Sequence, residues 1–379
     1  MLKLHTVPRV SHLGIRSSTR RHGLGLPSVM FFMVSMASMA SMASMVSMAF
    51  MSIGFVGVSG AQAGAIGDAP DAGAAAQTFL ASLDTSQRSE AVAAINAPDR
   101  GTWTYLAGPR TGLRLGDLQP EQRAAFDRFL ATALNEAGLR RVREVLAVEP
   151  TSDRGRGVRT GPGEYWIRFY GTPVPSPSKT EPPGHEREPA SDAWAWRLEG
   201  HHLSLNVAMV DGLVVSVTPF FFGAAPSTHA ELGEPLALDD GRAERLLASL
   251  DSIQKAAAMS IGPAPADVRS GTGSRPKMPR DGGIKAASLS TEQKAELDAL
   301  IIELLDVWPA GSTAHLRKRW KQTDPETVRF AWAGSARRNG PHYWRVMSPS
   351  LVLEFSNSSP AVNHAHLVLR TTDDEFSGR

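Results

Sequence analysis

An apolar stripe with helical spacing occurs twice along the chain. Its members recur at positions i, i+3, i+4, i+7 and i+8, and they are Phe126, Phe129, Leu130, Ala133 and Leu134 in the first stretch and Leu297, Leu300, Ile301, Leu304 and Leu305 in the second. This spacing places each set on one face of an α-helix. Pro120 suits the first turn of one helix, and Ser290 with Gln293 forms a capping box for the other. The pattern therefore predicts two equivalent helices that begin near residues 120 and 291.

Further matches between the two halves predict an internal duplication. The sequence LASLD occurs at residues 80–84 and again at 247–251, and Trp196-Arg197 aligns with Trp344-Arg345. In each half, helical patterns come first and alternating strand patterns follow. This order is typical of an α+β fold rather than of alternating βαβ units. We therefore expect an internally duplicated α+β unit, helices followed by antiparallel strands, in a pseudo-two-fold arrangement.

The alignment of the two halves also sets the expected domain boundaries. We predict a first α+β unit over residues 64–235 and a second over residues 236–379. A proline-rich insertion at residues 172–190 occurs in the first unit alone. Because this composition favours extended, poorly packed chain, we expect a surface loop without a core of its own.

Residues 1–63 have the composition of an export leader. A basic N-terminal stretch precedes an uncharged run at residues 29–58, and Ala61-Gln62-Ala63 matches the small-residue cleavage pattern of a secretory signal peptide. Arg20-Arg21 also resembles a twin-arginine export signal. We expect cleavage near Ala63 and a periplasmic or extracellular mature protein. The alternative is an uncleaved membrane anchor, because about 20 apolar residues suffice to cross a bilayer.

The charge balance changes once this leader is set aside. Five of the 40 Lys and Arg residues lie in the leader, which leaves 35 against 38 Asp and Glu, a net charge of −3. We therefore do not expect nucleic acid as a partner. The chain has no cysteine, which excludes disulfides, thiolate metal sites and a cysteine nucleophile. The G-x-S-x-G, H-E-x-x-H and Walker A motifs of common hydrolases and nucleotide enzymes are also missing from the sequence.

The strand pattern changes parity beside two adjacent histidines. Trp196 and Leu198 occupy even positions, whereas Leu203 and Leu205 occupy odd ones. Because strand side chains alternate between faces, one buried face then requires an extra residue between the two sets. The sequence Gly-His-His stands there, and glycine inside a strand often marks a β-bulge. We therefore expect a bulge at residues 200–202.

These histidines and a second pair form the candidate metal site. His364 and His366 are two residues apart, so on a strand they share one face with Arg370. A catalytic zinc ion takes three protein ligands and keeps one position open for water. His201 and His202 are the natural further ligands, so all four histidines make up the predicted metal set. Without thiolates, such a site would also admit Fe, Mn or Cu.

Four charged residues complete the predicted site. Glu199 or Glu354 would serve as a fourth ligand or as a general base for a metal-bound water. Arg345 and Arg370 would orient an anionic group of a small-molecule substrate through bidentate hydrogen bonds. Together these roles predict an exported metal-dependent enzyme, a hydrolase or an oxidoreductase, that acts on a small organic substrate.

The sequence around the histidines resembles a known family. Residues 200–204 (GHHLS) and 363–366 (NHAH) resemble the motifs of a family of exported proteins, domain-of-unknown-function family 3500. The likeness begins near Trp103 and covers nearly the whole mature chain. It implies that related chains continue beyond Arg379. The resemblance identifies relatives of the chain without implying a reaction.

The alternative interpretation of the histidines is a structural network. A buried histidine can be satisfied by hydrogen bonds to neighbouring groups, and the pattern His-x-His is short. The chain would then be a non-catalytic periplasmic or extracellular binding or scaffold protein. The sequence leaves both interpretations open, together with the oligomeric state, and a membrane would be a partner only if the leader were not cleaved.

Overall fold

The computed structural model describes residues 71–153, 155, 157–175, 193–337, 340–359 and 362–376. All of these residues belong to one folded unit, 63–379. The predicted leader lies outside the described residues, and so does the predicted proline-rich insertion beyond residue 175. Export of the protein and the structure of the insertion therefore stay predictions.

Helices and strands occur in blocks along the chain. The helices are α1 (Ala72–Ala81), α2 (Thr85–Ala91), α3 (Pro120–Ala133), α4 (Glu136–Val148), α5 (Ala237–Ser249), α6 (Ser252–Ala258), α7 (Thr291–Leu305) and α8 (Ala314–Gln322), with 3-10 turns η1 (Leu115–Asp117), η2 (Ala286–Ser288) and η3 (Ala310–Thr313). The strands are β1 (Val92–Ala93), β2 (Leu113–Arg114), β3 (Ser152–Asp153), β4 (Arg159–Thr160), β5 (Tyr165–Tyr170), β6 (Trp194–Gly200), β7 (Leu203–Val210), β8 (Leu213–Ser216), β9 (Phe220–Ala224), β10 (Ile284–Lys285), β11 (Arg329–Gly334), β12 (His342–Met347), β13 (Leu351–Ser356) and β14 (Ala365–Thr371). Among these described helices, none is both long and apolar enough to cross a membrane.

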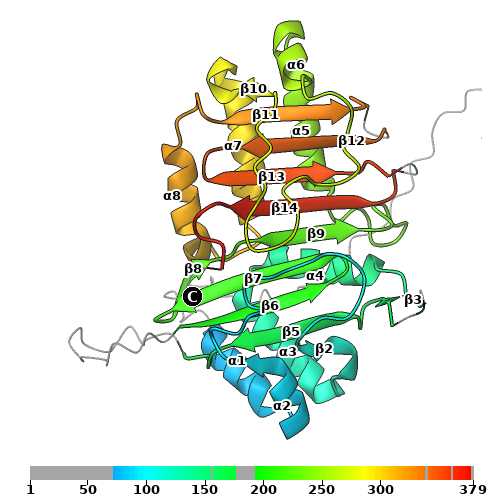
Figure 1. Ribbon diagram of the computed structural model, residues 1–379, viewed down its shortest axis with the longest axis vertical. Helices are drawn as coiled ribbons and strands as arrows, with labels where there is room; N and C mark the ends of the chain where they lie inside the picture. The colour runs from blue at the N-terminus through cyan, green and yellow to red at the C-terminus, as the bar shows by residue number, and fades with distance from the viewer. Residues whose placement is uncertain are drawn as a thin grey trace, which may run out of the picture. The chain divides into compact units, whose positions relative to one another are not determined.

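One twelve-stranded sheet organises the unit. Its order is β1-β5-β6-β7-β9-β14-β13-β12-β11-β10, with β2 beside β5 and β8 beside β7. The pair β1–β5 is parallel and the other pairs are antiparallel, so the sheet is mixed. Strands β9 and β14 are distant in the sequence but lie side by side in the sheet (Figure 1). The helices and this sheet confirm the predicted α+β class.

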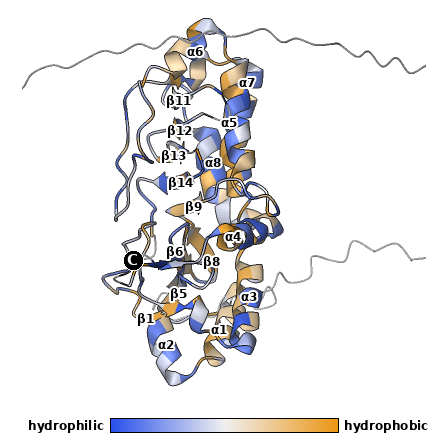
Figure 2. Ribbon diagram, turned by 90° about the vertical axis from the view of Figure 1, so that its right-hand side faces the viewer, coloured by the Kyte–Doolittle hydropathy of each residue, from blue (hydrophilic) through white to orange (hydrophobic). Residues whose placement is uncertain are grey.

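The two faces of the sheet are covered differently. Helices gather on one face and loops cover the other (Figure 2). On the helix-covered face, the ring centroid of Phe129 lies 5.3 Å from those of Phe169 and Trp196. Full burial of such an aromatic side chain contributes about 1.5–3 kcal/mol. The loop-covered face has a smaller apolar cluster that includes Tyr105 and Phe221.

Both helices predicted from the apolar stripes are confirmed. Pro120 is the first residue of α3. Ser290 caps α7 through the predicted capping box with Gln293. The stripes face the core, since Phe129 of α3 and Ile301 of α7 are fully buried. Local sequence signals therefore determine where these helices begin and which face they bury.

The two halves share a pattern of hydrogen bonds between helices. In the first half, the side-chain amides of Gln87 in α2 and Gln122 in α3 bond to each other. In the second half, Gln254 in α6 and Gln293 in α7 do the same at 2.9 Å. In both halves, the first of these glutamines also completes the capping box of its own short helix. A pair of glutamines therefore joins two helices in each half.

The predicted bulge beside the two histidines is wrong, because the structure has a β-hairpin there. Strand β6 ends at Gly200, and His201 and His202 form the turn before β7. In an antiparallel hairpin, residues that pair directly show their side chains on the same face. Leu198 pairs with Leu205, so an even position faces the same side as an odd one. Reversal of the chain thus explains the change of parity without an extra residue.

Candidate metal centre

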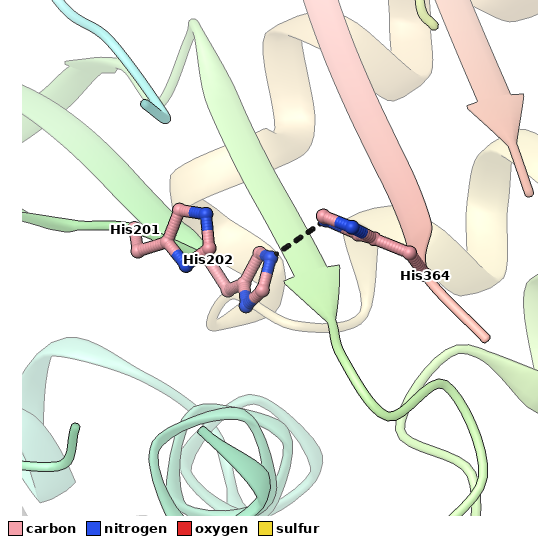
Figure 3. A group of neighbouring side chains, drawn as sticks. All are labelled: His201, His202 and His364. Carbon is pink, nitrogen blue, oxygen red and sulfur yellow. Dashed lines mark hydrogen bonds between the residues drawn. The ribbon is translucent and has the colours of Figure 1, made fainter. Parts of the chain in front are cut away.

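Three histidines from two distant segments meet at the ends of neighbouring strands. His201 and His202 form the turn between β6 and β7, and His364 lies directly before β14. Strand β9 pairs with both β7 and β14 and so brings these segments together. The Gly223 amide of β9 donates a 2.7 Å hydrogen bond to the His202 carbonyl. The imidazoles of His202 and His364 are turned toward each other (Figure 3).

The imidazole nitrogens lie close enough to share one metal ion. One nitrogen from each of His201, His202 and His364 lies within 4.8 Å of the other two. The Nε2 atoms of His202 and His364 are 2.9 Å apart. Two ligands at about 2.0–2.1 Å from a tetrahedral zinc ion would lie roughly 3.3 Å apart, so modest side-chain shifts would complete the site. His366 is outside this group, although its ring centroid lies 4.6 Å from that of His364.

A glycine in β9 makes room for the imidazoles. A Cβ atom at Gly223 would lie 2.6 Å from Cδ2 of His202 and 3.1 Å from Cδ2 of His366. Real Cβ atoms essentially never approach a neighbour at the shorter of these distances. Only a residue without a side chain therefore allows the two rings to lie against the strand.

Glu149 is a site residue that the sequence did not indicate. It follows α4 directly, its side chain is 1% exposed, and its two oxygens accept hydrogen bonds from Nδ1 of His201 and Nδ1 of His202. The first of these bonds is 3.0 Å long. Burial alone would raise the pKa of Glu149, but the hydrogen bonds from both histidines lower it to about 2. Glu149 precedes His201 by more than 50 residues in the sequence, and no local motif marks it as a site residue.

A second carboxylate holds the fourth histidine. Oδ1 of Asp267 accepts a 2.6 Å hydrogen bond from Nδ1 of His366, and Oδ2 accepts one of 3.1 Å from the Tyr105 hydroxyl. Burial acts to raise the pKa of Asp267, but His366, the Val268 amide and the Tyr105 hydroxyl together outweigh it, so that the pKa is lowered. Within the described chain, Nε2 of His366 is buried and has no hydrogen-bond partner. This nitrogen is therefore an unpaired ligand atom beside the imidazoles of His202 and His364.

The protonation states of His202 and His364 suit metal binding. Burial lowers the pKa of His202 to about 4, although Glu149 acts in the opposite direction. Burial and the neighbouring imidazoles lower the pKa of His364 to about 3. Both rings are therefore neutral at neutral pH, and neutral imidazole is the form that binds a metal ion.

The predicted alternation along β14 is confirmed for His366 and Arg370, whereas His364 lies before the strand. Leu367 belongs to the main hydrophobic core, whereas His366 and Arg370 contact aromatic residues of the separate cluster that includes Tyr105 and Phe221. There the ring centroid of His366 is 5.0 Å from that of Tyr105, and the guanidinium of Arg370 lies 5.4 Å from the ring centroid of Trp103. His366 and Arg370 therefore share a face, as the strand pattern indicates.

The two predicted catalytic glutamates lie outside the group of converging ligand atoms. Glu199 forms a 2.8 Å ion pair with Arg110, and both side chains are nearly buried. Glu354 accepts hydrogen bonds from the backbone amides of Arg269 and Ser270 and from the Tyr343 hydroxyl. Each carboxylate thus fastens a loop or a neighbouring strand. Their predicted role as ligand or general base stays a prediction.

The two predicted substrate-orienting arginines are fully buried and engaged by protein groups. Arg345 contacts both the carboxylate and the backbone carbonyl of Asp281. Arg370 forms two hydrogen bonds with the Glu375 carboxylate, at 2.9 and 2.7 Å, and donates to the Gly271 carbonyl at 2.7 Å. These contacts tie the loops to the sheet. Both arginines would have to release their present partners in order to bind a substrate.

Comparison with known proteins gives a family without a reaction. No curated protein and no solved structure matches the chain. One family model, described as a protein of unknown function (DUF3500), matches residues 67–378. This range includes the hairpin turn, β14 and both carboxylates that hold the histidines. The chain therefore belongs to the DUF3500 family of proteins of unknown function.

Proposed function

We propose that this protein binds a divalent transition metal through His201, His202 and His364. The observation that supports the proposal most strongly is the convergence of three imidazole nitrogens within 4.8 Å. The carboxylate of Glu149 holds two of these rings, an arrangement that often orients histidine ligands of metal ions. Imidazole donors without thiolates suit Zn, Fe, Mn or Cu.

We further propose that the centre is catalytic. Three histidine ligands would leave a coordination position for water or substrate, and a metal ion held there would supply the chemistry that activates water or oxygen toward a small organic substrate. His366 lies beside this position with its Nε2 free to meet the metal or a bound ligand. In this proposal, Glu199, Glu354, Arg345 and Arg370 hold the surrounding loops in place, because their charged groups are already paired.

One observation favours the alternative, a structural histidine network in a non-catalytic binding or scaffold protein. His202 has a partner at each ring nitrogen, Glu149 at Nδ1 and His364 at Nε2. The hydrogen-bonding groups of His202 are therefore satisfied without a metal ion. It leaves the buried Nε2 of His366 unexplained, which is why we place the metal centre first.

Metal content distinguishes the two functions. The native protein would be recovered from the compartment to which it is exported and measured by mass spectrometry, beside His364→Ala and a control, His315→Ala on α8. We expect near-stoichiometric metal in the native protein and in the control, and loss of metal from a still-folded His364→Ala. Absence of metal from all three after reconstitution would contradict the metal centre. His364→Ala should then mainly lower stability, since it removes a partner of a buried group.

Export and duplication belong to the same proposal. The composition of residues 1–63 supports export, and the net charge of −3 for the remaining chain supports a small-molecule partner over nucleic acid. The shared order of a helix pair, a short strand, a 3-10 turn, further helices and antiparallel strands in the two halves supports an internal duplication. The sheet order places β9 and β14 at the junction of these halves, which is where a pseudo-two-fold axis would pass.

A further inference from the structure

One buried carboxylate faces two adjacent imidazoles. The two oxygens of Glu149 meet Nδ1 of His201 and Nδ1 of His202, one oxygen to each ring. The ring centroids of the two histidines are 3.9 Å apart. The Glu149 side chain is 1% exposed, so solvent does not compete for its oxygens. The carboxylate is therefore held against the Nδ1 atoms of both rings inside the protein.

This arrangement determines which nitrogen of each histidine carries a proton. An ionised carboxylate only accepts hydrogen bonds, so both Nδ1 atoms must donate. A neutral imidazole has one N–H group, which leaves a lone pair on Nε2 of each ring. Nε2 of His202 faces Nε2 of His364 at 2.9 Å, and so His364 supplies the proton of that hydrogen bond.

The hairpin turn keeps the two rings beside the carboxylate. Gly200 precedes the turn, and a Cβ there would lie 2.3 Å from the ring of Tyr165. The Tyr165 ring therefore packs directly against the turn, and its hydroxyl lies 3.5 Å from Oε2 of Glu149. Both the turn and the carboxylate are thus held by the buried strand β5.

We propose that Glu149 is a positioning residue that sets the Nδ1–H tautomer of both His201 and His202, so that both rings offer Nε2 to a metal ion. The role in metal binding rests on the proposed metal centre, whereas the tautomers of the two histidines do not depend on a bound metal. The alternative is a purely structural Glu149, which would stabilise the hairpin without controlling the ligand atoms.

The isosteric change Glu149→Gln separates these roles. A glutamine side chain offers one acceptor oxygen and one donor nitrogen in place of two acceptors. One of the two histidines would then have to accept at Nδ1, and its proton would move to Nε2, the nitrogen that should bind metal. Loss of such outer partners typically weakens metal binding on the order of 10- to 100-fold. The matched control is Glu144→Gln, because Glu144 lies on α4, the helix that Glu149 directly follows, and pairs loosely with Arg140.

The experiment reads the tautomers and the metal affinity separately. Nitrogen-15 spectra of histidine-labelled, metal-free protein distinguish Nδ1–H from Nε2–H rings, with signals assigned by His201→Gln and His202→Gln. We expect both rings as Nδ1–H in the native protein and in Glu144→Gln, and one ring as Nε2–H in Glu149→Gln. Titration with Zn²⁺ should show the 10- to 100-fold loss of affinity in Glu149→Gln alone.

Each outcome bears on one of the two proposals. An Nε2–H ring at His201 or His202 in the native protein would overturn the positioning role, even if Glu149→Gln does not fold. Unchanged tautomers and affinity in a folded Glu149→Gln would overturn it as well. A native protein that binds no Zn²⁺ and shows the expected tautomers would count against the zinc centre and support the assignment of Glu149.

Discussion

The substitution Gly223→Ala tests whether the centre depends on the close approach of two imidazoles to β9. The added methyl group would lie 2.6 Å from Cδ2 of His202 and 3.1 Å from Cδ2 of His366. Carbon atoms in contact prefer separations of about 3.5–4.0 Å, so the His202 ring would have to move by roughly 1 Å. His202 is fully buried, and a close-packed interior offers little space for that movement.

Two effects of opposite sign decide the stability of this variant. Overpacking of a buried site typically costs about 1–3 kcal/mol. Alanine in place of glycine inside a strand raises the free energy of unfolding by about 0.5–1 kcal/mol, because the unfolded chain has less conformational freedom. The clash is the larger effect, and we expect the free energy of unfolding to fall by roughly 0.5–2 kcal/mol. Metal affinity should fall too, since the displaced His202 ring is one of the three proposed ligands.

Urea unfolding of the metal-free protein and calorimetric titration with Zn²⁺ measure these two effects. The matched control is Gly241→Ala in helix α5, where the nearest atom to an added Cβ is an Arg245 guanidinium nitrogen at 3.7 Å. This control should gain about 1 kcal/mol, because alanine is the better helix former. If Gly223→Ala matches the native protein in both measurements, the proposed contact between β9 and the imidazoles is wrong.

Three further measurements test other parts of the structure. Between about pH 6.5 and 4, acidification of the metal-free protein should lower its stability, because the folded state holds the pKa of His202 near 4 while the unfolded chain takes up that proton near pH 6.5. In urea titrations across this range, His202→Gln should flatten the slope, and an unchanged slope would contradict the assignment. Phe129→Ala should cost about 3–5 kcal/mol of unfolding free energy in urea, since Phe129 is fully buried; a cost below 1 kcal/mol would contradict its place in the core. Ser290→Ala should cost about 1 kcal/mol by the same assay, through loss of the α7 cap, and no change would show that the cap is dispensable.

Local patterns in the sequence predicted the features that depend on backbone geometry. The helical spacing located α3 and α7, and the capping signals at Pro120 and Ser290 located their first residues. Strand alternation placed His366 and Arg370 on one face of β14. The same alternation failed at the histidine turn, because a bulge and a hairpin both exchange odd and even positions. Parity alone contains no information about whether the chain reverses.

The amino-acid sequence by itself determined the helices, the strand faces and the histidines as candidate ligands. Only the tertiary structure decided which side chains hold those histidines. Glu149 reaches His202 because α4 ends beside the hairpin turn, and Asp267 reaches His366 across 99 residues of chain. Such contacts arise when helices and loops pack on the sheet and bring residues that are distant in the sequence next to each other. Periodicity describes one segment at a time, and so it cannot predict which carboxylate will meet a given imidazole.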